Sequence, residues 1–376
     1  MQDDILLNDG PVRTCFSADY AEARAKFIAA AQSAGAHLEH RVLEGIAGAR
    51  GETLATDVAL LGTAEAESLV VLSSGVHGAE GFCGSGCQVA LLRDPALLGL
   101  ARERRVALLL IHAVNPYGFS HLRRTNEDNI DLNRNFIDFA ARLPRNDAYL
   151  ELHDAICPRD WADASRAAAQ AELDAWIERH GQLAWMQAIM MGQYDEPTGL
   201  NFGGRAPEWS HRTLEAIVAK HLLKVQKLAF IDWHTGLGQP GQPFFLCFNP
   251  EGDPSWERAC RWWGRERIES RDGYAGAKRP RYNGLIFYGV QRLVAPAEMT
   301  GAVIEFGTLP VSESFEQLRV DRWLKFGQRP DDPDLLTRLR AGVGDAFTPA
   351  DPAWRRGVVE HATQIQLQGL SGLADW

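Results

Sequence analysis

Two short apolar runs, each followed almost at once by a histidine, constrain the fold of this chain more than any other feature. Leu69–Ser74 leads to His77 and Glu80, and Lys227–Trp233 leads directly to His234. Runs that are apolar at nearly every position are typical of strands buried on both faces of a parallel sheet. Because the carboxyl ends of such strands share one rim of an open α/β sheet, we expect these three polar side chains to meet there.

The rest of the chain alternates between helix and strand patterns. Helices are predicted over Ser17–Gly35, with Ser17 as the cap, and over Cys83–Leu92. Further strands are predicted at Leu38–Ile46, Thr53–Leu61, Val106–Val114, Pro243–Phe248 and Ala302–Phe306. Strands that alternate with helices indicate an α/β fold, in which helices flank a mostly parallel mixed sheet.

A long stretch without predicted strands follows Val114. It has a helical pattern from Asp147 to Met191, strongest over Ala167–Met191, and then a glycine-rich loop, Gln193–Ser210. A further helix, which Ser210 would cap, comes next. No linker of distinct composition marks a boundary. We therefore expect a single catalytic domain over 1–376, with a helical insertion at about 145–225.

Composition and charge limit the partners. The formal net charge of −10 argues against nucleic acid and membrane surfaces, because both require a basic face. The opening Met1-Gln2-Asp3-Asp4 lacks the basic-then-apolar order of a secretion signal. The six cysteines are spread too thinly for a disulfide framework. We therefore expect a cytoplasmic protein, whose oligomeric state the sequence leaves open.

His77, Glu80 and His234 are a suitable ligand set for one catalytic zinc ion. Zinc accepts imidazole nitrogens and carboxylate oxygens, and a catalytic site leaves a fourth position for water. His112 and His153 are alternative ligands, but neither has a metal-type sequence around it. Cys83 and Cys87 are spaced to share a helix face and could bind a metal, although small buried helix residues explain the spacing better.

Three further motifs lie between the zinc ligands: Asn115-Pro116-Tyr117-Gly118, Arg123-Arg124-Thr125-Asn126 and Asp131-Leu132-Asn133-Arg134-Asn135-Phe136. Together with His77 and Glu80, they resemble in order the signature of the zinc carboxypeptidase family, the carboxypeptidase A-like metallopeptidases. Tyr117 replaces the aspartate of the family's Asn-Pro-Asp-Gly turn, at a position that does no chemistry. The match extends to Glu305 and implies the carboxypeptidase-like α/β fold.

The resemblance implies roles for the residues around the metal. It makes His77, Glu80 and His234 the zinc ligands, and it makes Asp131 the carboxylate that hydrogen-bonds the first ligand histidine. Arg124 matches the arginine that polarises the scissile carbonyl and stabilises the oxyanion, with its neighbour Arg123 as the alternative.

The resemblance also implies substrate-binding and catalytic residues. Asn133 and Arg134 match the pair that grips a free substrate carboxylate. Glu305, the one carboxylate in the apolar Ala302–Phe306 strand, matches the general base, and the alternative is a structural ion-paired carboxylate. The family's tyrosine remains open between Tyr282 and Tyr288.

A second resemblance concerns Asp232-Trp233-His234-Thr235-Gly236, which is similar to the third-ligand motif of the aspartoacylase and succinylglutamate desuccinylase relatives. Asp232 leaves its strand on the same face as His234 and could support the site or lie at the edge of the core. The glycines and aromatics of the Gln193–Ser210 loop could line the substrate cleft or form an ordered turn over the insertion.

These features predict a zinc metallocarboxypeptidase that cleaves an amide next to a free carboxylate in small peptides. An N-acyl amino-acid deacylase of the aspartoacylase type is the alternative enzyme, with Arg134 holding the amino-acid carboxylate. An alternative of another class is a zinc-dependent binder of carboxylated ligands without turnover. The Cys83-Gly84-Ser85-Gly86 segment lacks the leading glycine of a nucleophile elbow, which disfavours a serine hydrolase.

Overall fold

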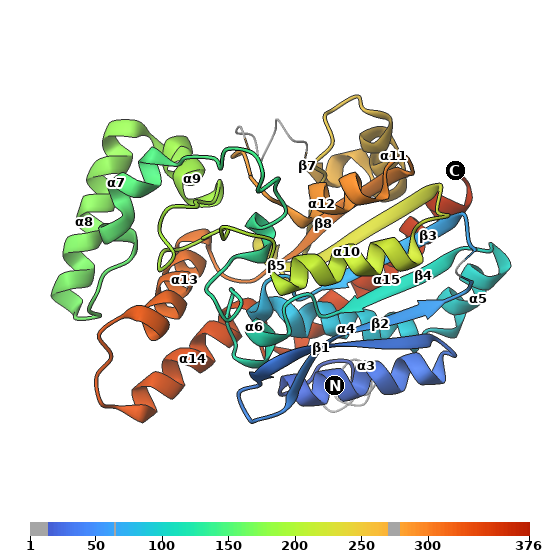
Figure 1. Ribbon diagram of the computed structural model, residues 1–376, viewed down its shortest axis with the longest axis horizontal. Helices are drawn as coiled ribbons and strands as arrows, with labels where there is room; N and C mark the ends of the chain where they lie inside the picture. The colour runs from blue at the N-terminus through green and yellow to red at the C-terminus, as the bar shows by residue number, and fades with distance from the viewer. Residues whose placement is uncertain (1–13, 64, 270–278) are drawn as a thin grey trace, which may run out of the picture.

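The computed structural model describes residues 14–63, 65–269 and 279–376 (Figure 1). The opening residues, on which the expectation of a missing secretion signal rests, lie outside this part. Among the described residues, eight strands form one mixed sheet in the order β1-β2-β4-β3-β5-β8-β6-β7. Neighbouring strands are parallel across the centre, β4-β3-β5-β8, and antiparallel at β1–β2, β2–β4 and β6–β8. The predicted α/β class is confirmed.

The strands agree closely with the apolar runs of the sequence. They are β1 His37–Ala47, β2 Thr53–Leu61, β3 Ser68–Ser74, β4 Ala107–His112, β5 Lys227–Pro240, β6 Pro243–Leu246, β7 Ile268–Glu269 and β8 Glu298–Gly307. Alternate residues of β3, β4 and β5 enter the apolar layers on opposite faces of the sheet. Both faces of the central strands are buried, which explains why these runs are apolar at nearly every position.

Helices cover both faces of the sheet. The helices are α3 Tyr20–Ser33, α4 Gly81–Leu92, α5 Pro95–Glu103, α6 Pro116–Ser120, α7 Asp147–Ile156, α8 Asp163–His180, α9 Gln182–Met190, α10 Trp209–His221, α11 Pro254–Trp263, α12 Ile286–Val294, α13 Val311–Phe326, α14 Pro333–Phe347 and α15 Pro352–Ala374. Helices α3, α4, α5, α11 and α15 pack on one face, and α10 and α12 on the other. None of the helices in the described ranges has the length and apolar character needed to cross a bilayer.

Two predicted helix caps are wrong. The first helix begins at Tyr20, and the side chain of Asp19, not that of Ser17, accepts a hydrogen bond from the backbone N–H of Glu22. The second begins at Trp209, two residues earlier than a cap at Ser210 implies, so Ser210 lies inside α10 and its N-terminal cap is Glu208. Serine and aspartate are both good capping residues, and local sequence alone does not choose between candidates two residues apart.

Helices α7, α8 and α9 lie together at the left of Figure 1 and share a small apolar cluster of their own. Gly181, at φ 89°, divides the predicted Ala167–Met191 helix between α8 and α9. Helix α10 belongs instead to the sheet, because Leu214 and Ile217 join its apolar layer. A helical insertion at about 145–225 stays a prediction.

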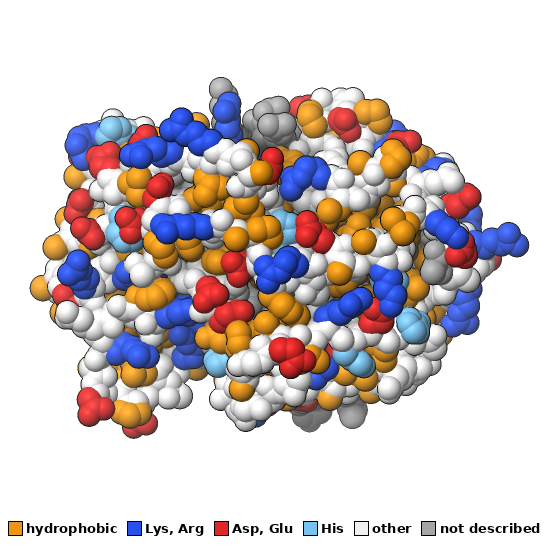
Figure 2. All heavy atoms as spheres, in the orientation of Figure 1, with side chains coloured by type: hydrophobic (Ala, Val, Ile, Leu, Met, Phe, Trp, Pro, Cys, Tyr) orange, Lys and Arg blue, Asp and Glu red, His pale blue; other side chains and the backbone are white. Residues whose placement is uncertain are grey.

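Basic and acidic side chains are mixed across the face shown in Figure 2.

His112, the last residue of β4, is a core histidine rather than a ligand. Its Nε2 lies 2.9 Å from Ser85 Oγ, and its ring stacks on Phe27 with the ring centroids 4.5 Å apart. Burial lowers the pKa of His112 to about 4, an effect that Asp57 opposes and Arg24 reinforces.

Acidification should therefore destabilise the fold through His112. The unfolded chain binds a proton at this residue near pH 6.5, whereas the folded chain does so only near pH 4. Stability should fall as the pH decreases through this window, by at most about 3 kcal/mol from this group. Urea unfolding of the native protein and of His112→Phe at pH 7 and pH 4.5 measures the effect. Equal losses of stability on acidification in the two proteins would contradict it.

Candidate metal centre

Three neighbouring parallel strands bring the predicted metal ligands and the predicted base together. His77 lies just beyond β3, His234 lies in β5, and Glu305 lies in β8 opposite His234 in the strand register. His77, Glu80 and His234 are all buried, and each offers an atom within 4.8 Å of the others. The structure thus places the three predicted ligands side by side.

A close backbone approach fixes the loop that carries His77 and Glu80. A Cβ on Gly78 would lie 1.9 Å from the carbonyl carbon of Gly118, so only glycine fits between the two ligands. Asn115 Oδ1 accepts a hydrogen bond from the backbone N–H of Gly118, and Asn115 Nδ2 donates to the carbonyl of Arg124. The Asn-Pro-Tyr-Gly motif therefore fastens the arginine segment to the ligand loop, a task that does not require aspartate at position 117.

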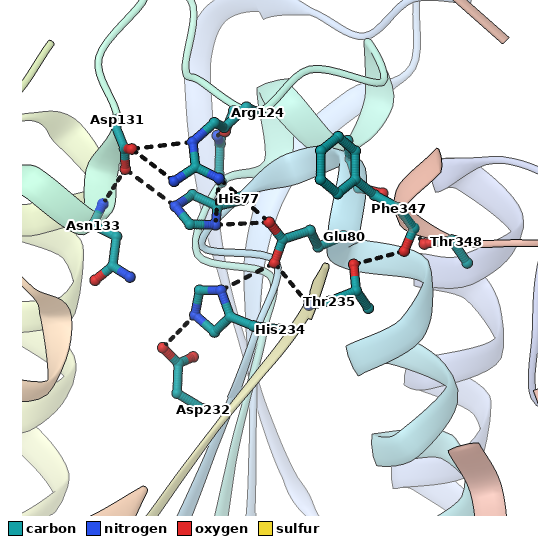
Figure 3. Close-up of polar contacts among 12 residues, drawn as sticks. His77, Glu80, Arg124, Asp131, Asn133, Asp232, His234, Thr235, Phe347 and Thr348 are labelled. Carbon is teal, nitrogen blue, oxygen red and sulfur yellow. Dashed lines mark hydrogen bonds and ion pairs between the residues drawn. The ribbon is translucent and has the colours of Figure 1, made fainter. Parts of the chain in front are cut away.

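The Glu80 carboxylate lies between the two imidazoles (Figure 3). Its Oε1 is 2.8 Å from His77 Nδ1, and its Oε2 is 3.0 Å from His234 Nδ1. The backbone N–H of Thr235 also donates to Oε2, at 3.0 Å. On the far side of each ring stands a second carboxylate: Asp131 Oδ1 is 3.2 Å from His77 Nε2, and Asp232 Oδ2 is 2.8 Å from His234 Nε2.

This arrangement fits a bound metal ion. A neutral imidazole has one N–H, yet both nitrogens of His77 and of His234 face carboxylate oxygens. Arg124 Nη1 can donate to His77 Nδ1, but the Nδ1 lone pairs of both rings also face Glu80 oxygens, and a cation among the two Nδ1 atoms and Glu80 would satisfy these atoms together. With a cation there, each Nε2–H donates to its outer carboxylate, as metal-binding histidines usually do. Two imidazoles and one carboxylate suit zinc.

The outer carboxylates stabilise positive charge at the rings. Burial raises the pKa of Asp131, but the charges of Arg124 and His77 outweigh it and hold the pKa well below its ordinary value. Burial lowers the pKa of His234, but Asp232 and Glu80 outweigh it and raise the pKa well above its ordinary value. Ser73 Oγ donates to the second oxygen of Asp232 at 2.5 Å, so this carboxylate supports the third ligand.

The adjacent arginines face in different directions. Arg124 donates from Nε and Nη2 to Asp131 Oδ2, at 3.1 and 3.0 Å, and its Nη1 is 3.2 Å from His77 Nδ1. Arg123 instead donates to Asp321, at 3.1 Å, away from the ligands. Of the two arginines, the structure places Arg124 beside the ligands, the residue that the sequence favoured.

Glu305 is 9% exposed, and its Oε2 has no hydrogen-bond partner among the described residues. Burial and the nearby Glu80 carboxylate raise the pKa of Glu305 to about 8, although His234 and Arg124 oppose this shift. The free oxygen argues against the alternative of a structural ion pair. A cation bound between Glu80 and His234 would lower the pKa of Glu305 and favour its basic form.

A cavity of about 150 Å³ opens beside the ligands and contains the predicted carboxylate-binding pair. Arg134 is buried, its Nη1 donates to the carbonyl of Asn133, and its Nε has no partner within the described ranges. Burial lowers the pKa of Arg134, an effect that Asp131 opposes and Arg124 reinforces. A Cβ on Gly284 would lie 2.1 Å from the Arg134 carbonyl oxygen, so a glycine is required behind it.

The structure also distinguishes the two tyrosines. Tyr282 lines the cavity, and the Arg134 guanidinium lies 5.4 Å from the centre of its ring. Tyr288 donates to the carbonyl of Phe248 and is not among the cavity-lining residues that the structure describes. Tyr282 is therefore the tyrosine that can contact a ligand.

The glycine-rich loop mainly supports Arg134 from behind. The Tyr194 hydroxyl donates to the carbonyl of Arg134 at 2.7 Å, and a Cβ on Gly203 would lie 2.9 Å from the same oxygen. Within the described part of this loop, Asn201 lines the cavity. The aromatics of the loop thus pack around the base of the site rather than forming its cleft.

The rival residues lie elsewhere. His153 is on α7, 4.0 Å from Glu196, and Cys83 and Cys87 are buried in the core on α4. Ser85 does contact a histidine, His112, but both side chains are buried to at least 98%, which leaves a substrate no access.

No sequence signal indicated the residues of the C-terminal part of the chain that close the site. The carbonyl of Phe347 accepts a hydrogen bond from Thr235 Oγ1 at 2.6 Å, and Thr348 Oγ1 donates to the carbonyl of Ala79 at 3.3 Å. Phe347 also lines the cavity (Figure 3). Helix α14 is amphipathic like many others, and only the three-dimensional structure shows that its end reaches the ligands.

The sequence matches the model of DUF2817, a family described as proteins of unknown function, over residues 16–361. The chain belongs to this family. None of the curated proteins matches the sequence.

The DUF2817 chain is also similar to solved structures. One is carboxypeptidase A from Helicoverpa armigera, at 12% identity and a TM-score of 0.44, covering 89% of this chain and 75% of that one. A metallo-carboxypeptidase from Pseudomonas aeruginosa is 15% identical, with a TM-score of 0.43 and coverage of 94% and 67%. Thrombin activatable fibrinolysis inhibitor is 9% identical, with a TM-score of 0.49 and coverage of 95% and 74%.

Removing the carboxylate behind the third ligand should weaken metal binding. The variant Asp232→Ala leaves His234 Nε2 without its acceptor, and we expect the dissociation constant for zinc to rise about 10- to 100-fold. Competition with a chromophoric chelator measures this constant without any substrate. Asp253→Ala, at the cap of the distant α11, is the control. An unchanged zinc affinity in Asp232→Ala would show that this carboxylate does not support the ligand.

Proposed function

We propose that this protein is a zinc-dependent metallocarboxypeptidase that acts on small peptides. The observation that carries the proposal is one cavity lined by His77, Glu80, Glu305 and a buried, incompletely paired Arg134. A metal-ligand cluster, a base and a carboxylate-binding group that face one space are what cleavage next to a free carboxylate requires.

A zinc ion held by His77, Glu80 and His234 would lower the pKa of a water molecule and polarise the scissile carbonyl. Glu305 supports this chemistry as the general base, because its free oxygen can take a proton from water and return it to the leaving nitrogen. Arg124 lies at the rim of the ligand cluster and can donate to the developing oxyanion.

Asn133 and Arg134 would hold the substrate carboxylate. The amide oxygen of Asn133 accepts a hydrogen bond from the backbone N–H of Ile286 at 2.9 Å, which fixes the orientation of this side chain. A guanidinium can bind a carboxylate through two parallel hydrogen bonds, and burial strengthens the interaction. Carboxylate capture here implies removal of a terminal residue rather than cleavage within a chain.

A deacylase of N-acyl amino acids is the second candidate, because the same groups would release an acyl chain from an amino acid held by Arg134. The contact between Asp232 and His234 favours it, since this pair belongs to the aspartoacylase-like motif. A zinc-dependent binder without turnover is the third candidate. The free oxygen of Glu305 argues for an enzyme, because a binder has no need of an uncompensated buried carboxylate.

An activity screen of the zinc-loaded protein tests the proposal. It compares dipeptides with a free carboxylate, the same dipeptides amidated, and N-acyl amino acids. We expect amidation to abolish hydrolysis, and Arg134→Gln to have the same effect on the free dipeptides. Comparable rates on free and amidated dipeptides would refute carboxylate capture, hydrolysis of the N-acyl amino acids alone would favour the deacylase, and tight binding without turnover would favour the binder.

A further inference from the structure

Helix α9 ends at the wall of the cavity and is fastened to two other parts of the chain. On one side, the Gln187 amide makes two hydrogen bonds with the backbone of Arg281: Nε2 donates to its carbonyl at 3.0 Å, and Oε1 accepts from its N–H at 2.7 Å. On the other side, the Trp185 ring meets the Phe315 ring of α13 edge to face, with the centroids 5.2 Å apart. Both α9 and α13 lie in the left part of Figure 1.

The end of α9 forms part of the cavity wall. Ile189 and Met190 line the cavity together with Phe315 and Leu318 of α13. Tyr282 also approaches α9, since its hydroxyl lies 4.0 Å from Met190 Sδ. A helix that is tied to the Arg281 segment and to α13, and that contributes to the wall between them, limits the space available to a ligand.

The interior of the cavity suits one apolar side chain. The residues on this part of the wall are Leu246, Phe248, Leu285 and Val303. The ionisable residues that line the described cavity are His77, Glu80, Arg124, Arg134 and Glu305, and each already has a role in the proposed reaction. Among the described lining residues, no further ionisable group is therefore available to pair with a basic or acidic substrate side chain. The whole cavity, with its polar end included, has a volume of about 150 Å³, comparable to an apolar cavity known to accept a benzene ring.

We propose that α9 roofs the site and restricts its substrate to one apolar amino acid that carries a short N-acyl group, such as an N-acetyl amino acid or a dipeptide. This inference rests on the proposed function, because it assumes that Arg134 holds the carboxylate. The side chain of the substrate amino acid then occupies the apolar part of the cavity, and the scissile amide lies near Glu305. The group on the amide nitrogen faces α9 and α13, and a long peptide would collide with them.

A length series tests the roof. N-acetyl-phenylalanine, glycyl-phenylalanine, and acetylated tetra- and octapeptides that end in phenylalanine are compared on the zinc-loaded protein. We expect kcat/KM to fall at least about tenfold from the two short substrates to the octapeptide. N-acetyl-lysine and N-acetyl-glutamate should be hydrolysed about 100-fold less efficiently than N-acetyl-phenylalanine, because their charges would be buried without partners.

Variants of the roof sharpen the test. Trp185→Ala removes the contact with Phe315 without touching the cavity lining, and Trp185→Phe is the matched control that keeps an aromatic ring. Trp185→Ala should raise kcat/KM for the octapeptide and leave that for N-acetyl-phenylalanine within about threefold. If Trp185→Ala does not fold, Gln187→Ala replaces it in the same measurement, because this variant removes the hydrogen bonds between α9 and the backbone of Arg281.

The outcomes separate the two proposals. Equal kcat/KM along the length series, or a preference for lysine or glutamate, would overturn the roof and leave the proposed function intact. The absence of hydrolysis across the whole panel would overturn the proposed function. Calorimetric binding of the same ligands still decides the size limit in that case, because tight binding of the octapeptide would contradict the roof and selective binding of N-acetyl-phenylalanine would support it.

Discussion

Glu305→Gln should retain zinc and lose about 10²- to 10⁴-fold of the hydrolytic rate. Glutamine has nearly the shape of glutamate but cannot accept the proton of a water molecule. Glu305 is not one of the three ligands that cluster within 4.8 Å, so metal content should not change. The rate is measured under single-turnover conditions with N-acetyl-phenylalanine and glycyl-phenylalanine, and bound zinc is measured on the same samples.

Glu298→Gln is the matched control, because this glutamate lies on the same strand but at its exposed start, in an ion pair with Arg258. It should leave both rate and zinc content close to those of the native protein. Near-normal turnover in Glu305→Gln would show that the base is another group. Loss of zinc from Glu305→Gln would instead make Glu305 a ligand.

His77→Ala should abolish the retention of zinc. It deletes one of three ligands and also leaves Asp131 without the ring that its carboxylate contacts. Two remaining ligands cannot hold the ion against dialysis, since catalytic zinc sites use three protein ligands. Elemental analysis after dialysis should find less than about one tenth of the native zinc content.

His153→Ala serves as the control, because His153 lies on α7 outside the ligand cluster. The melting temperature gives a second measure: added zinc should raise it in the native protein and in His153→Ala but not in His77→Ala. Full zinc occupancy in His77→Ala would contradict the proposed ligand set.

The central sheet and the ligand cluster could be predicted because their signals are local. Leu69–Ser74 and Lys227–Trp233 are mostly apolar, since both faces of their strands are buried, and His77 and His234 directly follow or nearly follow these apolar runs. Strand adjacency then brings the ligands together without any knowledge of loops. Glu305 follows the same rule, as the single carboxylate of the apolar segment Ala302–Phe306.

The walls of the site could not be predicted, because they depend on how distant helices pack. Nothing in the sequence of α9 indicates that Gln187 bonds to Arg281 or that Trp185 meets Phe315. The predicted helix also ran through Gly181, because one glycine in a helical pattern does not by itself end a helix. Tertiary contacts, rather than propensity, decide these features.

The contact between the end of α14 and the ligand loop has a consequence for biosynthesis. His77 and Glu80 leave the ribosome early, but Thr348, which donates to the carbonyl of Ala79, and Phe347, which accepts from Thr235, are translated some 270 residues later. A nascent chain that contains only β1 to β4 lacks His234 and also lacks the contacts made by Phe347 and Thr348. The ligand set and the contacts that close it should therefore be complete only late in synthesis, so we expect a nascent chain that ends before them not to retain the metal ion.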